Sequence, residues 1–345
     1  MKKLAKSITI NHVAKAAGVS TATISRALNQ PEAVRPALKE HIEKTIKKLG
    51  YIPNASARSL MLRRSGTIGM IVPTLDNAIF AQGLAAFQEQ LLESHYQLLV
   101  ASSNYDPYIE ANQINNLLLR GVEGMAFFGI SQQLETLRLL QNRGVPYIHI
   151  GALKAPISGF CSGFDNQQAI QLGIQHLLDL GHIKFGMIAG ITANNDRARD
   201  RVKGSVSLLK KNKIDLLPSL IIECPYTIEA ARDALKQLLR IEPKLTAIIC
   251  GNDVLALGAL LEASKQGIAV PKKLSIMGFD DLELSRHLMP SLTTMHVNAN
   301  SMWREAAKHL VEQINGVHGL PKEIKTPVNL VIRESTGKSP KSYKN

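Results

Sequence analysis

Polar side chains follow several apolar runs in the second part of the sequence, and their types could bind a small polar ligand. Asn252 and Asp253 follow the run TAIICG, and Asp280 follows the run SIMGF. Arg197 and Arg201 come after FGMIAG and are four residues apart, so they share one face of a helix. Carboxylates and amides bond adjacent hydroxyl groups, and arginine binds a ring oxygen or a carboxylate. The set therefore predicts a site for a polyhydroxylated molecule of the sugar or sugar-acid class.

Each of these positions also has a simpler structural interpretation, because polar residues are preferred just before the first turn of a helix. Asn252, Asp165 and Asn77 stand where such an N-cap is expected. Taken singly, Asp165, Asn166 and Asp253 are better explained as caps than as ligand contacts. The residues alone leave both interpretations open.

A second set of side chains, between residues 20 and 29, suits contact with DNA. Arg26 can donate two parallel hydrogen bonds to guanine, and Asn29 can bond a base or a phosphate. Threonine and alanine offer methyl groups to thymine. The residues expected on the outer face of this segment are Thr21, Ala22, Thr23, Ser25, Arg26 and Asn29.

Helical spacing predicts how these side chains are positioned. Residues 10–17 repeat apolar positions at helical spacing and end at Gly18, which is a natural C′ residue. Ser20 or Thr21 can cap a second helix, and a third is expected over 36–49. Two short helices joined by a glycine-containing turn form a helix-turn-helix, whose second helix enters the major groove. A generic three-helix bundle with a basic surface is the alternative.

The positive charge is concentrated in the same part of the chain. Of the net charge of +13, the first 64 residues carry +10 and the remainder carries +3. A small basic module attached to a nearly neutral large one indicates a polyanion partner, most commonly nucleic acid. A solvated basic face or a membrane-surface helix would give the same charge. Because the charge coincides with the helix-turn-helix pattern, we expect double-stranded DNA as the partner.

The length and composition exclude several other classes of protein. A chain of 345 residues is too long for one ordinary core, and 45% apolar with 20% charged residues is typical of a folded globular protein. Three cysteines cannot form a disulfide framework, and the basic N-terminus lacks the apolar core of a secretory signal. No apolar run is long enough to span a bilayer. These features favour a cytoplasmic protein that has no contact with a membrane.

From Thr67 onward, apolar runs alternate with helical stretches, which predicts two doubly wound parallel-sheet subdomains of α/β type. Strands are expected at 68–72, 97–102, 124–129, 146–150, 161–164, 185–190, 220–223, 247–250, 274–279 and 327–333. Helices are expected near 78–93, 109–120, 133–143, 167–180, 198–212, 228–240, 253–266 and 300–314. About four strand–helix units precede residue 160 and about four follow it. Ligands of such sheets bind at the carboxyl ends of the strands.

The expected domain organisation has four parts. Residues 1–53 form the all-α helix-turn-helix domain, and residues 54–64 form a linker. Residues 65–333 form the ligand-binding and dimerisation domain. Residues 334–345 are expected to be a flexible tail.

Several motifs occur in a specific order along the chain. They are TINHVAKAAGVSTATISRALN (9–29), LGYIPNASARSL (49–60), IGMIVP (68–73), HLLDLGH (176–182), GNDVLALGAL (251–260), SIMGFDD (275–281) and PSLTT (290–294). In order and spacing they resemble the lactose-repressor (LacI/GalR) family of bacterial transcription regulators. The resemblance covers about residues 9–333 and implies a periplasmic-binding-protein-like effector domain. One departure is His12, where the family usually carries aspartate.

The linker takes on a function through this resemblance. Asn54 can cap a helix over 54–62, but a helix of about two turns is marginal by itself. The resemblance implies that two such hinge helices, one from each subunit, pair in the minor groove of a palindromic operator. Leu60 would then be inserted at the central base step, Ala57 would permit close approach, and Arg58 would lie near phosphates. An ordinary polar linker is the alternative.

The resemblance also assigns site residues in the rest of the chain. Thr9 and Ser20 complete the expected DNA contacts of the first domain. The resemblance places the contacts of a small-molecule effector at Arg201, Asn252 and Asp280, and near Asp76, Asn77 and Phe80. Some sugar-binding members have an acidic residue three positions after Asp165, where this sequence has Gln168. Because the family consists mostly of inducible repressors, we expect a homodimeric repressor that a metabolite controls.

Signatures of catalysis are absent from the sequence. It has no GxxxxGKS/T phosphate loop, no GxGxxG after a strand, no GxSxG and no HExxH. We therefore expect no enzyme activity, no cofactor and no metal. A kinase with a DNA-binding head is one alternative, which turnover of ATP would reveal. A periplasmic solute-binding protein is another, but residues 1–64 and the missing signal argue against it.

Overall fold

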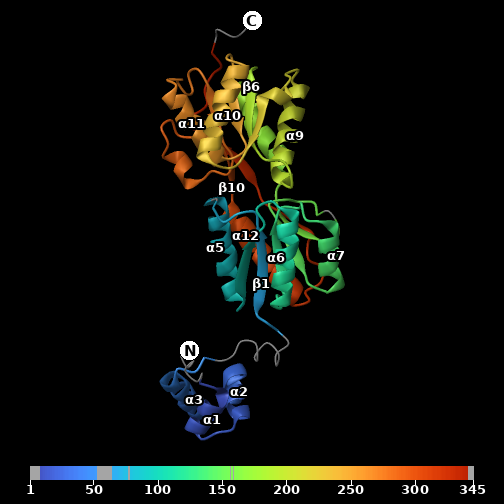
Figure 1. Ribbon diagram of the computed structural model, residues 1–345, viewed down its shortest axis with the longest axis vertical. Helices are drawn as coiled ribbons and strands as arrows, with labels where there is room; N and C mark the ends of the chain where they lie inside the picture. Colours follow the sequence, from blue (N-terminus) through green and yellow to red (C-terminus); the bar gives the residue numbers. More distant parts are fainter. Residues whose placement is uncertain (1–7, 53–63, 77, 156, 158, 341–345) are drawn as a thin grey trace, which may run out of the picture. The chain divides into compact units, whose positions relative to one another are not determined.

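The chain consists of two compact units, Met1–Ser65 and Gly66–Asn345 (Figure 1). The computed structural model describes residues 8–52, 64–76, 78–155, 157 and 159–340. Within these residues, no helix has both the length and the apolar character needed to cross a membrane.

The first unit is a three-helix module. It contains α1 (Ile10–Ala17), α2 (Thr21–Asn29), the short helix η1 (Pro31–Ala33) and α3 (Pro36–Leu49). Val13, Ile24 and Ile42 are buried where the helices meet. Gly18 ends α1 in the left-handed region at φ 67°, which glycine adopts without strain. The three helices expected from the spacing are confirmed.

Side chains cap the first two helices of this unit. Ser20 Oγ accepts a hydrogen bond from the backbone N–H of Thr23 at 3.1 Å, which confirms Ser20 as the cap of α2. At the start of α1, the backbone N–H of Thr9 donates to Nδ1 of His12 at 3.0 Å. His12 therefore supplies the acceptor that an acidic residue supplies in a capping box. The departure from the family pattern at this position keeps the cap.

The second unit contains two parallel sheets and a separate pair of strands. The six-stranded sheet has the order β11-β5-β4-β3-β1-β2, and its strands are β1 (Thr67–Val72), β2 (Gln97–Ser102), β3 (Gly124–Phe128), β4 (Tyr147–Ile150), β5 (Phe160–Gly163) and β11 (Glu323–Lys325). The four-stranded sheet has the order β7-β6-β8-β9, and its strands are β6 (Phe185–Gly190), β7 (Ile221–Cys224), β8 (Ala247–Cys250) and β9 (Ser275–Met277). The antiparallel pair consists of β10 (Thr294–Val297) and β12 (Val328–Val331).

Helices cover both sheets (Figure 1). The first sheet is covered by α5 (Ala78–Glu93), α6 (Pro107–Leu119), α7 (Leu134–Asn142) and α12 (Ala299–Ile314). The second is covered by α8 (Asn166–Asp179), α9 (Asp196–Lys211), α10 (Ile228–Ile241) and α11 (Asp253–Lys265), and short helices lie at η2 (Pro218–Leu220) and η3 (Glu283–Arg286). On β1, Met70 and Ile71 belong to hydrophobic clusters on opposite faces of the sheet. The doubly wound α/β prediction is confirmed.

The two sheets do not divide the chain into a part before residue 160 and a part after it. β5 follows residue 160 at once but pairs with β4, and α12 and β11 return to the first sheet from the end of the chain. The chain therefore passes between the two sheets three times. The parallel pairing of β11 with β5 joins Glu323 to Cys161. β10 pairs with β12 and β11 pairs with β5, which are both distant in the sequence. Because such pairings leave no local pattern, the sequence does not predict β10 or β11.

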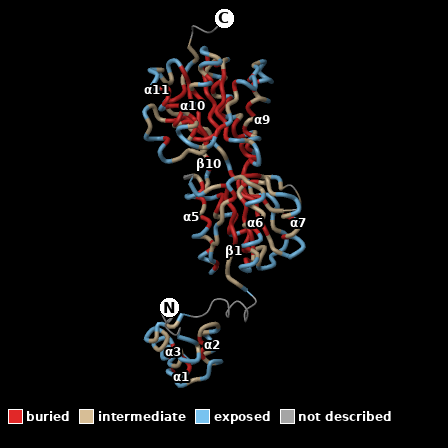
Figure 2. Tube along the Cα trace, viewed as in Figure 1, coloured by how far each residue is buried: buried red, intermediate tan, exposed pale blue. Residues whose placement is uncertain are grey.

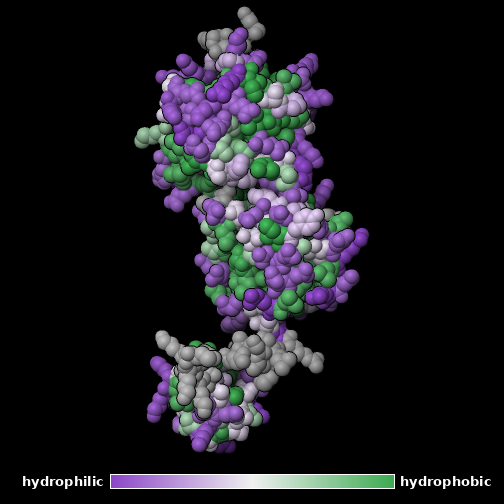
Figure 3. Space-filling model, in the orientation of Figure 1, coloured by the Kyte–Doolittle hydropathy of each residue, from purple (hydrophilic) through white to green (hydrophobic). Residues whose placement is uncertain are grey.

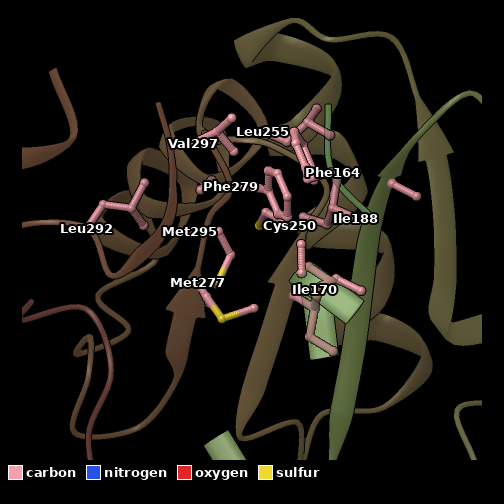
Figure 4. Close-up of a cluster of buried hydrophobic side chains, with 14 of the residues drawn as sticks. Phe164, Ile170, Ile188, Cys250, Leu255, Met277, Phe279, Leu292, Met295 and Val297 are labelled. Carbon is pink, nitrogen blue, oxygen red and sulfur yellow. The ribbon is translucent and has the colours of Figure 1, made fainter. Parts of the chain in front are cut away.

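Burial is greatest along the central strands of both sheets and on the inner face of α12 (Figure 2). In the second sheet, the apolar side chains of several elements converge on Phe279 (Figure 4). Phe164 stacks on the Phe279 ring at 5.9 Å between centroids. Phe279 directly precedes Asp280, so this core fixes the backbone that carries a predicted site residue.

The prediction of a flexible tail from residue 334 is wrong for residues 334–340. Ser335 is completely buried, and its Oγ donates to the carbonyl of Ile276 at 2.6 Å. Nε2 of His182 donates to the carbonyl of Gly337 at 2.9 Å. The pattern of polar residues in this segment therefore reflects hydrogen bonding to the second sheet. Residues 341–345 lie outside the described part of the chain.

Candidate DNA-binding and effector sites

The outer face of α2 carries the side chains predicted to read DNA. Thr21, Ala22 and Arg26 are exposed, whereas Ile24 and Ala27 on the opposite face are buried in the core of the first unit. This division fixes which side of α2 remains available to a groove of DNA. Arg26 is free to extend from it and to make paired hydrogen bonds.

The other predicted residues of the first unit make local contacts. Nδ2 of Asn29 donates to Ser25 Oγ at 3.3 Å, and Ser20 Oγ lies 2.9 Å from Thr23 Oγ1. Thr9 is exposed at the N-terminus of α1. These hydroxyl and amide groups are thus positioned by their neighbours at the exposed edge of the module. The predicted contacts Asn54, Ala57, Arg58 and Leu60 lie outside the described residues, as does Asn77.

Arg201 occupies the centre of the polar site in the second unit. Its Nε donates to Asn166 Oδ1 at 3.0 Å, and its Nη1 donates to the carbonyl of Gly251 at 2.6 Å. Its guanidinium carbon lies 3.7 Å from the centroid of the Phe279 ring. Nη2 lies 3.8 Å from Oδ1 of Asp280, too far for a hydrogen bond but within range of an ion pair.

Asp280 is held in an unusual conformation and environment. Its φ of 109° lies in the region that favours glycine, and Asp281 beside it has φ 54°. Burial raises the pKa of Asp280 to about 8, although the guanidinium of Arg201 acts in the opposite direction. At neutral pH the carboxyl group is therefore mainly protonated and can donate a hydrogen bond. Strained residues with shifted pKa values are typical of functional sites.

Asn252 is buried close to these residues but has a structural task. Its Oδ1 accepts from the backbone N–H of Leu255 at 2.9 Å and so caps α11. The structure thus supports the capping interpretation for Asn252, and Asp165 caps α8 in the same way. Asn166, by contrast, does not act as a cap, because it joins Arg201 to the carbonyl of Gly151.

Asp253 also does not act as a cap. Its carboxylate accepts hydrogen bonds from Ser285 Oγ and Thr294 Oγ1, both at 2.6 Å, and from the N–H of Leu282 at 2.8 Å. Burial raises its pKa to about 6, while these hydrogen bonds favour the charged form. The residue fastens the segment after β9 to α11, so its role is structural.

Arg197 and Asp196 connect the two sheets across the site. Oδ1 of Asp196 accepts from the N–H of Ile130 and from Ser131 Oγ, both at 3.1 Å. The same atom pairs with Nη1 of Arg197 at 2.8 Å. Nη1 of Arg197 also donates to the carbonyl of Phe128 at 3.1 Å. The start of α9 is therefore fastened to the end of β3.

Aromatic rings form the wall beside Arg197. Its guanidinium lies 4.7 Å from the centroid of Phe128, which stacks on Trp303 at 5.4 Å. Phe80 is buried and packs edge-to-face with Phe128, with 4.9 Å between the ring centroids, so it supports the wall. Asp76 is exposed, and its N–H donates to Thr74 Oγ1; the described contacts do not bring it to Arg201.

Two small cavities of about 20 Å³ each lie in this region. One is bounded by Arg201, Asp280 and Trp303. Phe128 and Arg197 line both cavities and therefore separate them. The spacing of Arg197 and Arg201 already indicated a shared helix face, but nothing local indicated Asp196 or Phe128. Trp303 also lines the site.

Comparison with known proteins agrees with this arrangement of two units. Residues 9–54 match the model of the bacterial regulatory proteins of the lacI family, and residues 174–336 match the model of a periplasmic binding protein-like domain. The HTH-type transcriptional repressor PurR of Haemophilus influenzae (strain PittEE) is 32% identical over 338 residues. The alignment covers 95% of this chain and 98% of that protein.

Solved structures are similar over nearly the whole chain. The lac repressor dimer bound to operator and the anti-inducer ONPF is 27% identical, with a TM-score of 0.84, over 96% of this chain and 100% of that one. The complex of the transcriptional regulator CelR with cellobiose is 26% identical, with a TM-score of 0.71, over 95% and 99%. Together with the helix-turn-helix and the closed polar site, these similarities show that the chain belongs to the lacI family and is a DNA-binding regulator of transcription.

Proposed function

We propose that this protein is a repressor that binds a palindromic operator as a homodimer and acts in the cytoplasm. The observation that carries the proposal is the exposed row of Thr21, Ala22 and Arg26 on α2, in a chain that also contains a buried polar site. A recognition helix of this kind reads one half-site, so two copies suit an operator of two equal halves. The hinge residues Asn54, Ala57, Arg58 and Leu60 would contact the minor groove between the halves. The relative PurR bears the name of a repressor, which supports the direction of regulation.

We infer that a small metabolite binds in the cleft between the two sheets and controls operator binding. Arg201, Asn252 and Asp280 are the proposed contacts at the second sheet, and Asp76, Asn77 and Phe80 are the proposed contacts from the part of the sequence that follows β1. Arg197 and Asp196 already join the two sheets, so a ligand that breaks or replaces their contacts favours another arrangement. We propose binding rather than catalysis as the activity, with no cofactor. The CelR structure, which contains cellobiose, supports the sugar class.

A second copy of the chain would cover apolar side chains that are exposed on the second unit. Leu261 on α11, Ile228 at the start of α10 and Leu284 in η3 are exposed. Ile228 and Leu284 line a groove of about 510 Å³ together with Val254 and Leu257 of α11. Figure 3 shows apolar side chains at the surface of this unit on the sides of α5 and α11. The similar lac repressor structure is a dimer, which supports this choice of partner.

Selection of bound sequences from a random DNA pool tests the proposal. The full chain should enrich a site with two equal half-sites, and sedimentation of the complex should show two chains per site. Selection repeated with a mixture of metabolites should change the yield of bound DNA. Enrichment of single half-sites by a monomer would contradict the homodimer, and no enrichment under either condition would contradict operator binding.

A further inference from the structure

Two buried oxygen atoms in the cleft have no hydrogen-bond partner. Among the described residues, Oε1 of Glu110 and Oε1 of Gln132 are the buried side-chain oxygens in this state. Both residues line the same cavity of about 20 Å³, which Arg197 and Phe128 separate from Arg201. A buried acceptor without a hydrogen-bond partner is unfavourable. Two such atoms at one cavity therefore indicate that a donor from outside the chain belongs there.

The two residues act as one polar unit. Burial raises the pKa of Glu110, and a hydrogen bond from the Gln132 side chain acts in the opposite direction. The Gln132 amide already donates to Glu110, and the two unpartnered oxygens are acceptors of residues that line the cavity. The unit can thus accept further hydrogen bonds through these two oxygens.

The ion pair at the cavity and the size of the cavity suit a small neutral donor. Arg197 lines the cavity and carries a fixed positive charge, which is paired with Asp196. Asp196 lines the cavity as well, so this ion pair adds no net charge beside Glu110. A cavity of this size holds about one water molecule, so it also accommodates one hydroxyl group.

The strained backbone around the cavity supports a binding role. Tyr105 and Asn194, which line it, have φ of 61° and 54°, in the region that favours glycine. Such conformations are uncommon and persist where the surrounding structure enforces them. Neither residue lies in a helix or strand, so the two unusual conformations belong to the wall of the cavity and not to a regular element.

We propose that Glu110 and Gln132 determine the specificity of the cleft by accepting hydrogen bonds from a hydroxyl group of a polyhydroxylated effector. The inference rests on the proposed regulation by a metabolite and names the group that is read. An effector that also reaches Arg201 displaces Arg197 or Phe128, because these two side chains separate the cavities. Entry of the effector is thereby coupled to the contacts that join β3 to α9.

Binding of matched probes to the purified full chain tests this assignment. D-Gluconate, D-glucose and D-ribose present hydroxyl groups, whereas hexanoate presents a carboxylate on a chain without them. At millimolar concentration, at least one of the three hydroxylated probes should raise the Tm of the wild type, and hexanoate should not. Calorimetric titration then gives the Kd of the probe that binds.

The double variant Glu110→Met/Gln132→Met removes both acceptors at nearly constant volume. We expect it to bind the hydroxylated probe at least about tenfold more weakly than the wild type. Its Tm without a probe should equal or exceed that of the wild type, because two unsatisfied oxygens are gone. Glu110→Gln, which keeps an oxygen but loses the charge, should bind with intermediate affinity. Gln133→Met at the exposed neighbouring position is the matched control and should bind like the wild type.

Two results would overturn the assignment. One is failure of all three hydroxylated probes to shift the Tm of the wild type. The other is unchanged affinity in both the double variant and Glu110→Gln. Operator selection does not use these probes, so a chain that selects an operator but binds none of them refutes this inference and leaves the regulator proposal standing.

Discussion

Arg201 and Asp280 face one another at 3.8 Å while both are almost completely buried, but they do not form a hydrogen-bonded salt bridge. Burial raises the pKa of Asp280 to about 8, so its carboxyl group is mainly neutral at pH 7. The charge of Arg201 is instead balanced by the carbonyl of Gly251 and the face of Phe279. The pair therefore presents two hydrogen-bond donors to a ligand, and its protonation connects the cleft to the stability of the fold.

We expect Asp280 to make the protein less stable as the pH rises from about 7 to about 8. The pKa of an aspartate in an unfolded chain is about 3.9, so between this value and about 8 the folded chain holds a proton that unfolding releases. Stability therefore falls with increasing pH across that range and levels off above it. Asp280→Asn cannot titrate and should lack this slope. The free energy of unfolding from urea titrations at several pH values measures it.

The pH range from about 7 to about 8 separates the titration of Asp280 from that of other buried groups. Burial raises the pKa of Asp253 only to about 6, so its proton is lost before the window begins. Burial lowers the pKa of His149 to about 4, so that side chain is neutral throughout. Asp215→Asn at an exposed position is the matched control and should keep the slope of the wild type. Identical slopes in the wild type and in Asp280→Asn would contradict a protonated Asp280.

Replacement of Arg26 tests base recognition by α2. If the guanidinium reads a guanine, Arg26→Ala should cost about 1–3 kcal/mol in operator affinity and relax the preference at one position of each half-site. Binding to a library of single-base operator variants measures both effects. Lys48→Ala removes one exposed charge from α3. It should weaken binding to all sequences by the same factor, which should be smaller than the effect of Arg26→Ala on the operator. If Arg26→Ala also weakens all sequences equally, Arg26 contacts phosphate alone.

The cap formed by His12 predicts the local stability of α1. His12→Ala leaves the N–H of Thr9 without its acceptor and should destabilise the helix by about 1 kcal/mol. His12→Glu restores an acceptor of the capping-box type and should recover this loss. Hydrogen exchange of peptides that cover residues 10–17 measures the difference, with His41→Ala on α3 as the control. Equal protection of α1 in all three variants and the wild type would show that the cap does not stabilise it.

The sequence predicts those features of the fold that depend on neighbouring residues. Gly18 and Ser20 mark the turn between α1 and α2, because a left-handed C′ position and a side-chain cap are local requirements. The continuous apolar runs predict the strands of both parallel sheets for the same reason. Asp280 could be assigned because the motif at 275–281 covers it, and Arg201 because the family resemblance implies an effector contact there. The structure brings the two residues together.

Features that depend on distant parts of the chain could not be predicted in this way. The contact of Arg197 with Phe128 and the environment of Asp253 arise only when the two sheets meet. Glu110 resembles any charged residue of an amphipathic helix in the sequence. Its unpartnered oxygen becomes evident only from the packing around it. Polar residues near the C-terminus suggested disorder, although their hydroxyl groups satisfy buried groups of the second sheet.

The C-terminal segment 334–340 should therefore contribute to the stability of the fold. Ser335 Oγ donates to the carbonyl of Ile276 at 2.6 Å and accepts from the N–H of Thr293 at 2.8 Å, at a completely buried position. Ser335→Ala removes both bonds and should lower the free energy of unfolding by about 1–3 kcal/mol.

Two truncated chains test the contribution of the whole segment to stability. A chain that ends after Arg333 should lose more stability than Ser335→Ala, because it also removes the bond between His182 and Gly337. A chain that ends after Pro340 keeps all of these contacts and should unfold like the full chain in urea. If the chain that ends after Arg333 is as stable as the one that ends after Pro340, the hydrogen bonds of this segment do not stabilise the second sheet.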